Sequence, residues 1–264
     1  MFEYFFLFPV GLLVATVAMS SGVAGSNFWI PIYLLGLGLD PRLAFWTSLV
    51  TMLFGSGSGV VRNLRDRTVE VGLVRSHAPW VLASAAVGGL AAPRIDVEPL
   101  LAGYALFVGV YGGWLLVSSW RTAGVAGGSG DETGGGPLRL RATVAGGFQG
   151  LIATGSGALL MPAFLSRRPQ APARAVGSAV LLVFMSSLVA ALVRLDGALL
   201  ETLRAEAGVV FSMTAFAAAG AALGGQLGPR VAARLPALWL RRYVAGVLIT
   251  VGVLVARRVV LGMD

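Results

Sequence analysis

The sequence predicts an all-α membrane protein built from two related halves. Two observations carry this prediction. Of the 264 residues, 56% are hydrophobic and only 12% are charged, and the mean hydropathy of +0.82 lies well outside the range of soluble domains. In addition, residues 21–34 recur as residues 152–165, with a constant offset of 131 positions that also aligns Pro31 with Pro162 and Glu70 with Glu201. A duplicated membrane unit accounts for both observations.

Eight apolar segments divide into four and then four. A chain of this length has room for about eight helical passes of ~20 residues with short loops, and none for a separate soluble domain. The segments are residues 5–39, 43–61, 79–92, 100–120, 142–165, 175–193, 207–227 and 238–255. We therefore assign residues 1–122 to a first transmembrane repeat, 123–138 to a glycine-rich linker and 139–264 to a second transmembrane repeat.

The first apolar segment of each half is interrupted by glycine and small polar residues. Residues 5–39 are too many for one straight crossing at about 1.5 Å per residue, while each apolar arm is too short to cross alone. A broken, re-entrant hairpin of two half-helices fits this length better. The other three segments of each half then form three transmembrane helices.

The twenty arginines indicate how the two halves are oriented. If each first segment enters the membrane and returns to the same side, the two halves are inverted. Fourteen arginines then lie on the cytoplasmic side of the membrane and six on the outer side. If each first segment crosses once, the halves are parallel and the count is eleven against nine. Basic residues accumulate in cytoplasmic loops. The count therefore favours inverted repeats in the cytoplasmic (inner) membrane, with the arginine-rich loops on the cytoplasmic side.

The interruptions are the expected binding site. The apolar spans hold no Asp, Glu, Lys or Arg away from their ends, which disfavours a carboxylate proton relay. Glycine lets the chain leave helical geometry, and a half-helix that restarts at about Asn27 or Ala158 presents free N–H groups to an anion. The substrate-binding candidates at the interruptions are Ser21, Gly22, Gly25, Ser26, Asn27, Thr154, Gly155, Ser156 and Gly157.

Four further kinds of residue accompany the interruptions. Thr47 and Ser178 open the next helix of each half, where they either donate to the same ligand or cap that helix. Pro31 and Pro162 are expected to shape the second arm of each hairpin. Trp29 and Trp46 lie near the first interruption and are expected to gate or shape the path. Glycines elsewhere, such as Gly88 and Gly224, are typical of close helix packing.

A repeated motif surrounds these residues. A glycine-rich run is followed by a proline and then by an alanine-led motif that opens the next helix. The residues are Gly22, Val23, Ala24, Gly25 and Ser26 with Pro31, then Ala44, Phe45, Trp46, Thr47 and Ser48, and in the second half Ala153, Thr154, Gly155, Ser156 and Gly157 with Pro162, then Ala175, Val176, Gly177, Ser178 and Ala179. With this pattern the chain resembles the TauE/SafE family of sulfite and organosulfonate exporters over essentially its whole length. The resemblance implies a multi-pass transporter of small sulfur-containing anions such as sulfite or sulfoacetate.

The expected function is secondary transport or facilitated passage of a small anion by alternating access. The expected partners are that anion and the lipid bilayer, with a proton or sodium ion as candidate coupling ion and a homodimer compatible with the sequence. The net charge of +8 is explained by membrane topology, so nucleic acid is not an expected partner. No cofactor or metal is expected, since cysteine is absent and His77 is the one histidine. A non-transporting scaffold subunit and, less favoured, a membrane-embedded enzyme acting on a lipid-linked substrate remain alternatives.

The inverted arrangement predicts where introduced thiols react. Because the chain has no cysteine, Arg168→Cys and Arg234→Cys each create a single reactive thiol. We expect a membrane-impermeant maleimide to label both from the cytoplasmic face only. Labelling from the outer face would contradict the inverted arrangement.

Overall fold

A computed structural model describes residues 3–21, 25–121, 135–167, 172–232 and 237–261, which are helical apart from short connections. The elements are α1 (Leu7–Ser21), α2 (Ser26–Pro31), the π-helix η1 (Ile32–Gly36), α3 (Pro41–Arg65), α4 (Val71–Ala91), the 3-10 helix η2 (Ala92–Arg94), α5 (Val97–Arg121), α6 (Gly135–Ile152), α7 (Ser156–Arg167), α8 (Pro172–Val193), α9 (Gly197–Ala205), α10 (Ala207–Ala232) and α11 (Ala237–Leu261). Within these ranges there is no strand, as the all-α prediction requires.

Five helices of the described chain are long and apolar enough to cross a membrane. The candidate spans are Pro41–Arg65, Val97–Trp120, Ala173–Val193, Ala207–Gly228 and Arg242–Leu261, in α3, α5, α8, α10 and α11. Two shorter apolar helices, Leu7–Met19 and Ser156–Leu165, belong to the interrupted segments. The helix α4 is not among the five, and it carries Arg75 and His77 in its first two turns. The class of multi-pass membrane protein is therefore confirmed.

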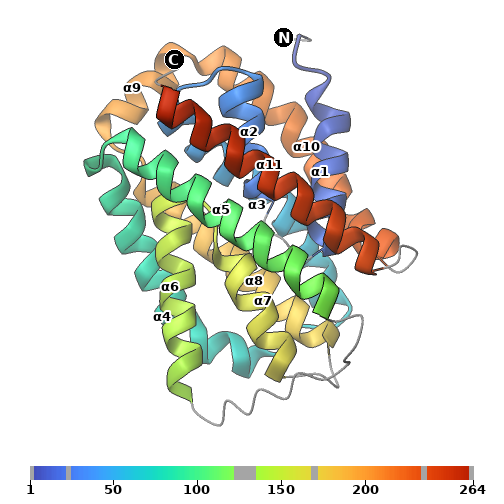
Figure 1. The fold of residues 1–264 in the computed structure, drawn as a ribbon. Coiled ribbons are helices and arrows are strands. Elements are labelled where there is room, and N and C mark those ends of the chain that lie inside the picture. The colour runs from blue at the N-terminus through green and yellow to red at the C-terminus, as the bar shows by residue number, and fades with distance from the viewer. Residues whose placement is uncertain (1–2, 22–24, 122–134, 168–171, 233–236, 262–264) are drawn as a thin grey trace.

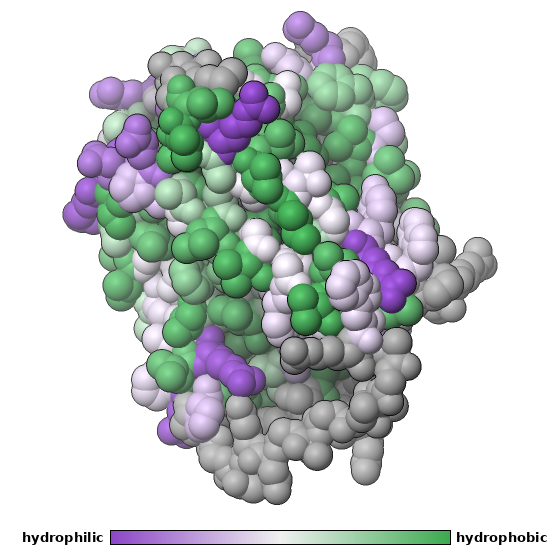
Figure 2. Space-filling view, viewed as in Figure 1, coloured by the Kyte–Doolittle hydropathy of each residue, from purple (hydrophilic) through white to green (hydrophobic). Residues whose placement is uncertain are grey.

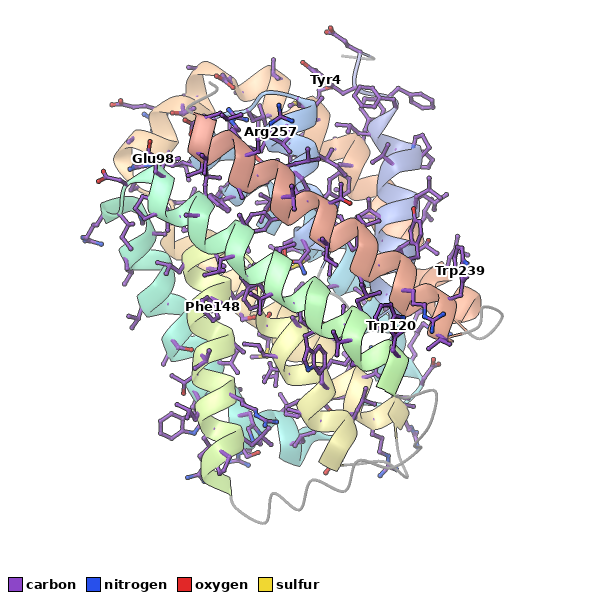
Figure 3. The ribbon with its side chains drawn as sticks, in the orientation of Figure 1. Tyr4, Glu98, Trp120, Phe148, Trp239 and Arg257 are labelled. Carbon is purple, nitrogen blue, oxygen red and sulfur yellow. The ribbon has the colours of Figure 1, made fainter. Side chains whose placement is uncertain are left out.

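The surface has the polarity that a bilayer requires. Large apolar side chains point outward along the helices, among them Leu106, Phe211 and Val253, which are 69%, 68% and 61% exposed. Apolar residues cover most of the visible face, and the hydrophilic ones gather mainly toward its rims (Figure 2). Trp120 lies at the end of α5 opposite Glu98, and Trp239 lies at the end of α11 opposite Arg257 (Figure 3). Tryptophan at the ends of spans is typical of interfacial anchoring.

Polar residues define where helices begin. The carboxylate of Asp40 accepts hydrogen bonds from the backbone N–H groups of Arg42 (2.9 Å) and Leu43 (3.3 Å), and Pro41 occupies the first helical position of α3. Asp196 caps α9 in the same way, through the N–H of Leu199 at 2.8 Å. These caps fix the ends of two helices on one side of the molecule.

Helices from the two halves of the sequence pack against each other. The first helix α1 lies along α10, α6 lies along α4, α3 packs against α8, and α5 packs against α11 (Figure 1). The short helix α2 packs on α3, while α7 packs on α8 and α6. The predicted linker 123–138 lies outside the described residues up to residue 134, and residues 135–138 begin α6.

Glycine permits the closest of these contacts. A Cβ added at Gly220 of α10 would collide with the carbonyl oxygen of Phe8 on α1, and one at Gly150 of α6 would collide with that of Ala85 on α4. At Gly88 an added Cβ would lie 2.5 Å from the carbonyl oxygen of Gly147. Small residues thus let the helix backbones approach within van der Waals contact, as in other membrane bundles.

The interrupted segments lie at the centre of the bundle. All six residues of α2 are buried, and Trp29, Tyr33, Tyr104 and Phe45 are among the largest fully buried side chains. The chain runs from α2 directly into η1 after Pro31, which lacks an N–H group. In contrast, α7 stays α-helical through Pro162. The two second arms therefore differ in backbone geometry.

The glycine contacts predict a stability difference between two matched substitutions. Gly220→Ala should lower the melting temperature in detergent, because overpacking a helix contact costs about 1–3 kcal/mol. Gly113→Ala is the control, since a Cβ there meets nothing within 4 Å and alanine favours the helix. Equal melting temperatures for the two variants would contradict close packing of α1 on α10.

Candidate functional site

The two interruptions meet in the centre of the molecule. The hydroxyl of Thr154, between α6 and α7, donates a hydrogen bond to the side-chain carbonyl of Asn27 in α2. The hydroxyl of Tyr104 on α5 donates to the backbone carbonyl of Asn27 at 2.9 Å. All three side chains have no solvent exposure. Residues from distant parts of the chain thus form one buried polar cluster.

The second interruption is held in an unusual backbone conformation. Ala153 has φ of 56° and Gly155 has φ of 117°. The left-handed conformation costs an alanine about 1–2 kcal/mol, whereas glycine adopts positive φ readily. A side chain at Gly155 would also lie 2.7 Å from the Cβ of Phe148, whose ring points toward the molecular centre (Figure 3). This backbone ends α6 and lets α7 restart at Ser156.

A glutamine holds the start of α7. The side-chain carbonyl of Gln149 accepts hydrogen bonds from the hydroxyl (2.7 Å) and the backbone N–H (3.3 Å) of Ser156. Its amide nitrogen donates to the hydroxyl of Ser187 on α8 at 3.0 Å. The three side chains are fully buried. Gln149 therefore connects α6, α7 and α8 at the interruption.

Three buried donors near the first interruption have no hydrogen-bond partner in the part of the chain that the structure describes. They are the hydroxyl of Ser26, the side-chain amide nitrogen of Asn27 and the hydroxyl of Thr47, all with zero exposure. Such a group costs about 1–3 kcal/mol when left unsatisfied. Ser26 and Asn27 begin α2, and Thr47 lies on α3, against which α2 packs. These donors suit a ligand that accepts hydrogen bonds.

Other predicted residues of the first interruption lie around this cluster. Gly25 is buried and precedes α2, and Trp29 is stacked on Tyr33 with ring centres 5.3 Å apart. Pro31 is the last residue of α2. Ser21 is the last residue of α1, and Gly22 lies outside the described residues. In the second interruption, Gly157 is buried in the first turn of α7, and Pro162 lies further along it.

Two predicted residues make their hydrogen bonds elsewhere. The hydroxyl of Ser178 accepts a bond of 2.9 Å from the backbone N–H of Glu70, the residue that precedes α4. The indole N–H of Trp46 donates to the carbonyl of Ala191 on α8 at 3.0 Å. Ser178 thus connects α8 to α4, and Trp46 connects α3 to α8.

Sequence reasoning missed a buried arginine beside the second interruption. Arg194 follows the span of α8 and is 5% exposed. Its guanidinium donates to the carbonyls of Gly150 (2.9 Å) and Leu151 (2.6 Å), in the last turn of α6, and lies 5.5 Å from the ring centre of Phe45. Burial lowers the pKa of the Arg194 guanidinium from its usual value, and an arginine side chain stays charged at neutral pH. In the sequence it was indistinguishable from the other loop arginines.

Metal-binding groups are not gathered in the described part of the chain. No three His, Asp or Glu side chains lie close enough there to hold an ion. The Nδ1 atom of His77 lies 2.8 Å from the carbonyl of Leu73 and 2.8 Å from the hydroxyl of Ser76, and its ring packs edge-on against Phe164. His77 therefore takes part in packing and helix hydrogen bonding.

Comparison with known families decides the class of the protein. The profile of the family described as sulfite exporter TauE/SafE matches residues 7–255, nearly the whole chain. The chain belongs to the TauE/SafE family. No curated protein and no solved structure gives a match. Membership of the TauE/SafE family makes this protein a membrane transporter of the class that handles sulfite and organosulfonate-type anions.

The Gln149 contacts predict a loss of stability on substitution. Gln149→Leu should lower the melting temperature in detergent, because Ser156 and Ser187 each lose a buried partner, at about 1–3 kcal/mol per unsatisfied group. Thr250→Val on α11 is the control, because that exposed hydroxyl donates to the carbonyl of Gly246 in its own helix. Identical melting curves for the two variants would contradict a structural role for Gln149.

Proposed function

We propose that the protein carries sulfite or a small organosulfonate across the membrane and binds it where the two interruptions meet. The observation that carries this proposal is a group of three fully buried donors that have no partner among the described residues and lie beside the contact between Asn27 and Thr154. Buried polar groups in proteins nearly always have partners. A transported ligand supplies the acceptors that the protein itself does not.

The chemistry of the cluster favours a small oxyanion. Ser26, Asn27 and Thr47 offer hydroxyl and amide N–H groups, which donate to sulfite or sulfonate oxygens without a formal positive charge. The N-terminus of α7 at Ser156 adds the positive end of a helix dipole. Weak, neutral donors also release the anion more readily than a tight ion pair. A carrier needs this balance, because the same site must fill and empty in each cycle.

The cluster contains no carboxylate, so it has no group of its own to carry a proton. If transport is coupled to protons, the proton travels on the substrate as its protonated form. Sodium is the other candidate coupling ion. Trp29, stacked on Tyr33 and wholly buried, then shapes the path beside the first interruption.

Alternating access between inverted repeats is the proposed mechanism. Its support is that helices of one half pack against helices of the other half. The first helix of each half packs on a later helix of the opposite half, α1 on α10 and α6 on α4, and α3 packs on α8. In Figure 1, α1 begins at the end where both termini are drawn, and α6 begins at the opposite end. Transporters with inverted repeats open alternately by rocking one repeat against the other around a central site.

Access to the central cluster requires movement. Ser26, Asn27, Thr154 and Ser156 have no solvent exposure in this conformation. The contact between Asn27 and Thr154 joins the two interrupted segments directly. We propose that separation of these segments opens the site, first toward one face of the membrane and then toward the other. The arginine-rich loops lie on the cytoplasmic side of the inner membrane in this proposal.

Removal of the hydroxyls of Thr47 and Ser26 should reduce transport without reducing stability. Thr47→Val and Ser26→Ala eliminate buried groups that lack a partner, so the melting temperature should stay the same or rise. Uptake of labelled sulfite into proteoliposomes should fall about tenfold in kcat/KM for each variant, since one hydrogen bond to a charged group contributes about 1.5 kcal/mol.

Thr214→Val is the matched control for this experiment. The Thr214 hydroxyl is also buried and unpartnered, but it lines an apolar groove on α10 together with Val50 and Phe54. We expect this variant to transport sulfite like the wild type. The proposal is wrong if the wild-type protein shows no saturable uptake of sulfite or small sulfonates. It is also wrong if Thr47→Val retains the same kcat/KM as Thr214→Val.

A further inference from the structure

A small pocket lies at one end of the bundle, apart from the central cluster. Its volume is about 30 Å³, and its lining includes Arg42, Phe45 and Trp46 from the start of α3 and Arg194 and Asp196 from the segment after α8. The remaining walls come from η2 and the first turns of α5 and α9. The pocket thus forms where the ends of several helices converge.

The two arginines at the pocket form no ion pair with a described residue. Arg194 is almost wholly buried, yet among the described residues its guanidinium contacts only two backbone carbonyls and the face of Phe45. The Arg42 side chain is half-buried and forms no ion pair with a described residue. The carboxylates nearby serve as helix caps, with Asp196 at the start of α9 and Asp40 at the start of α3. A buried cation without a carboxylate partner is costly, and an anion removes that cost.

From this arrangement we infer that Arg42 and Arg194 form a second binding site, which receives the oxyanion headgroup of the substrate as it enters or leaves. This inference rests on the proposed transport of a small anion. A water molecule requires about 10–15 Å³ of such space, so the pocket has room for a group of two or three oxygen atoms. The planar donors of arginine suit the oxygens of a sulfite or sulfonate group.

Arg194 also connects this pocket to the central cluster. The two carbonyls that it binds, those of Gly150 and Leu151, belong to the last turn of α6, directly before the interruption at Ala153. A cation at a helix C-terminus stabilises that end of the helix. An anion that binds Arg194 competes with these carbonyls for the guanidinium. Occupation of the pocket therefore loosens the end of α6, so that the second interruption is freer to move when substrate arrives.

Arg42→Gln tests the second site without touching the central cluster. We expect this variant to raise the KM for sulfite uptake into proteoliposomes about tenfold, as for loss of one charge-assisted hydrogen bond, with an unchanged melting temperature. Arg94→Gln is the matched control. Arg94 in η2 lies at the same end, donates to the carbonyl of Leu90 in the last turn of α4 and is not among the residues that line the pocket. Its loss should leave the KM unchanged.

Arg194→Lys provides a second variant with a different expected pattern. Lysine keeps the charge but lacks the planar donors that bind two carbonyls at once. We expect this variant to have a raised KM for sulfite and a lower melting temperature than the wild type. Added sulfite should raise its melting temperature by less than it raises that of the wild type. If the wild type shows saturable uptake, and Arg42→Gln has the same KM as Arg94→Gln, the second site is wrong but the proposed function stands. Absence of saturable wild-type uptake would overturn the proposed function itself.

Discussion

An interrupted helix inside a membrane protein must have its free backbone groups bound by other parts of the protein, because lipid offers them no hydrogen bonds. The rest of this structure depends on that constraint. At the second interruption, Gln149 binds the first N–H of α7 and Arg194 binds the last carbonyls of α6. At the first, Tyr104 binds the carbonyl of Asn27 at the start of α2. Further along the same segment, Arg258 from α11 donates to the carbonyl of Leu34 in η1 at 2.7 Å. Each side chain comes from a helix that must lie close by.

Small residues make that proximity possible, and they leave the two interruptions unlike each other. Glycines in α6 and α10 allow backbone contact with α4 and α1, which brings the interrupted segments to the centre. There the second interruption is tightly held through Gln149, with Ala153 in a left-handed conformation. The segment after the first interruption continues from α2 into the π-helix η1, and π-helical geometry is often found at functional positions. The halves share a sequence pattern, but the hydrogen bonds at their two interruptions differ.

In the proposed function, the central cluster is less stable than a fully hydrogen-bonded core would be, and a bound ligand offsets that cost. Ser26, Asn27 and Thr47 hold donors with no hydrogen-bond partner among the described residues, and Ala153 carries backbone strain. Features of this kind persist where a ligand compensates for them. Arg194, at the end of the bundle, is likewise incompletely stabilised, because it is a buried charge bound by neutral carbonyl groups. The path proposed for the anion thus follows the polar groups that the fold leaves least satisfied.

Composition, the internal repeat and the glycine pattern together predict a helical membrane protein with two interrupted segments, because apolar length and helix-breaking residues act locally. They do not predict which side chains meet. The bond between Asn27 and Thr154, the attachment of Ser178 to Glu70 and that of Trp46 to Ala191 join residues more than a hundred positions apart. Arg194 has the local sequence of an ordinary loop arginine, and only the position of α6 beside α8 buries it against Gly150. Such contacts depend on how whole helices pack, and no local pattern of residues specifies that packing.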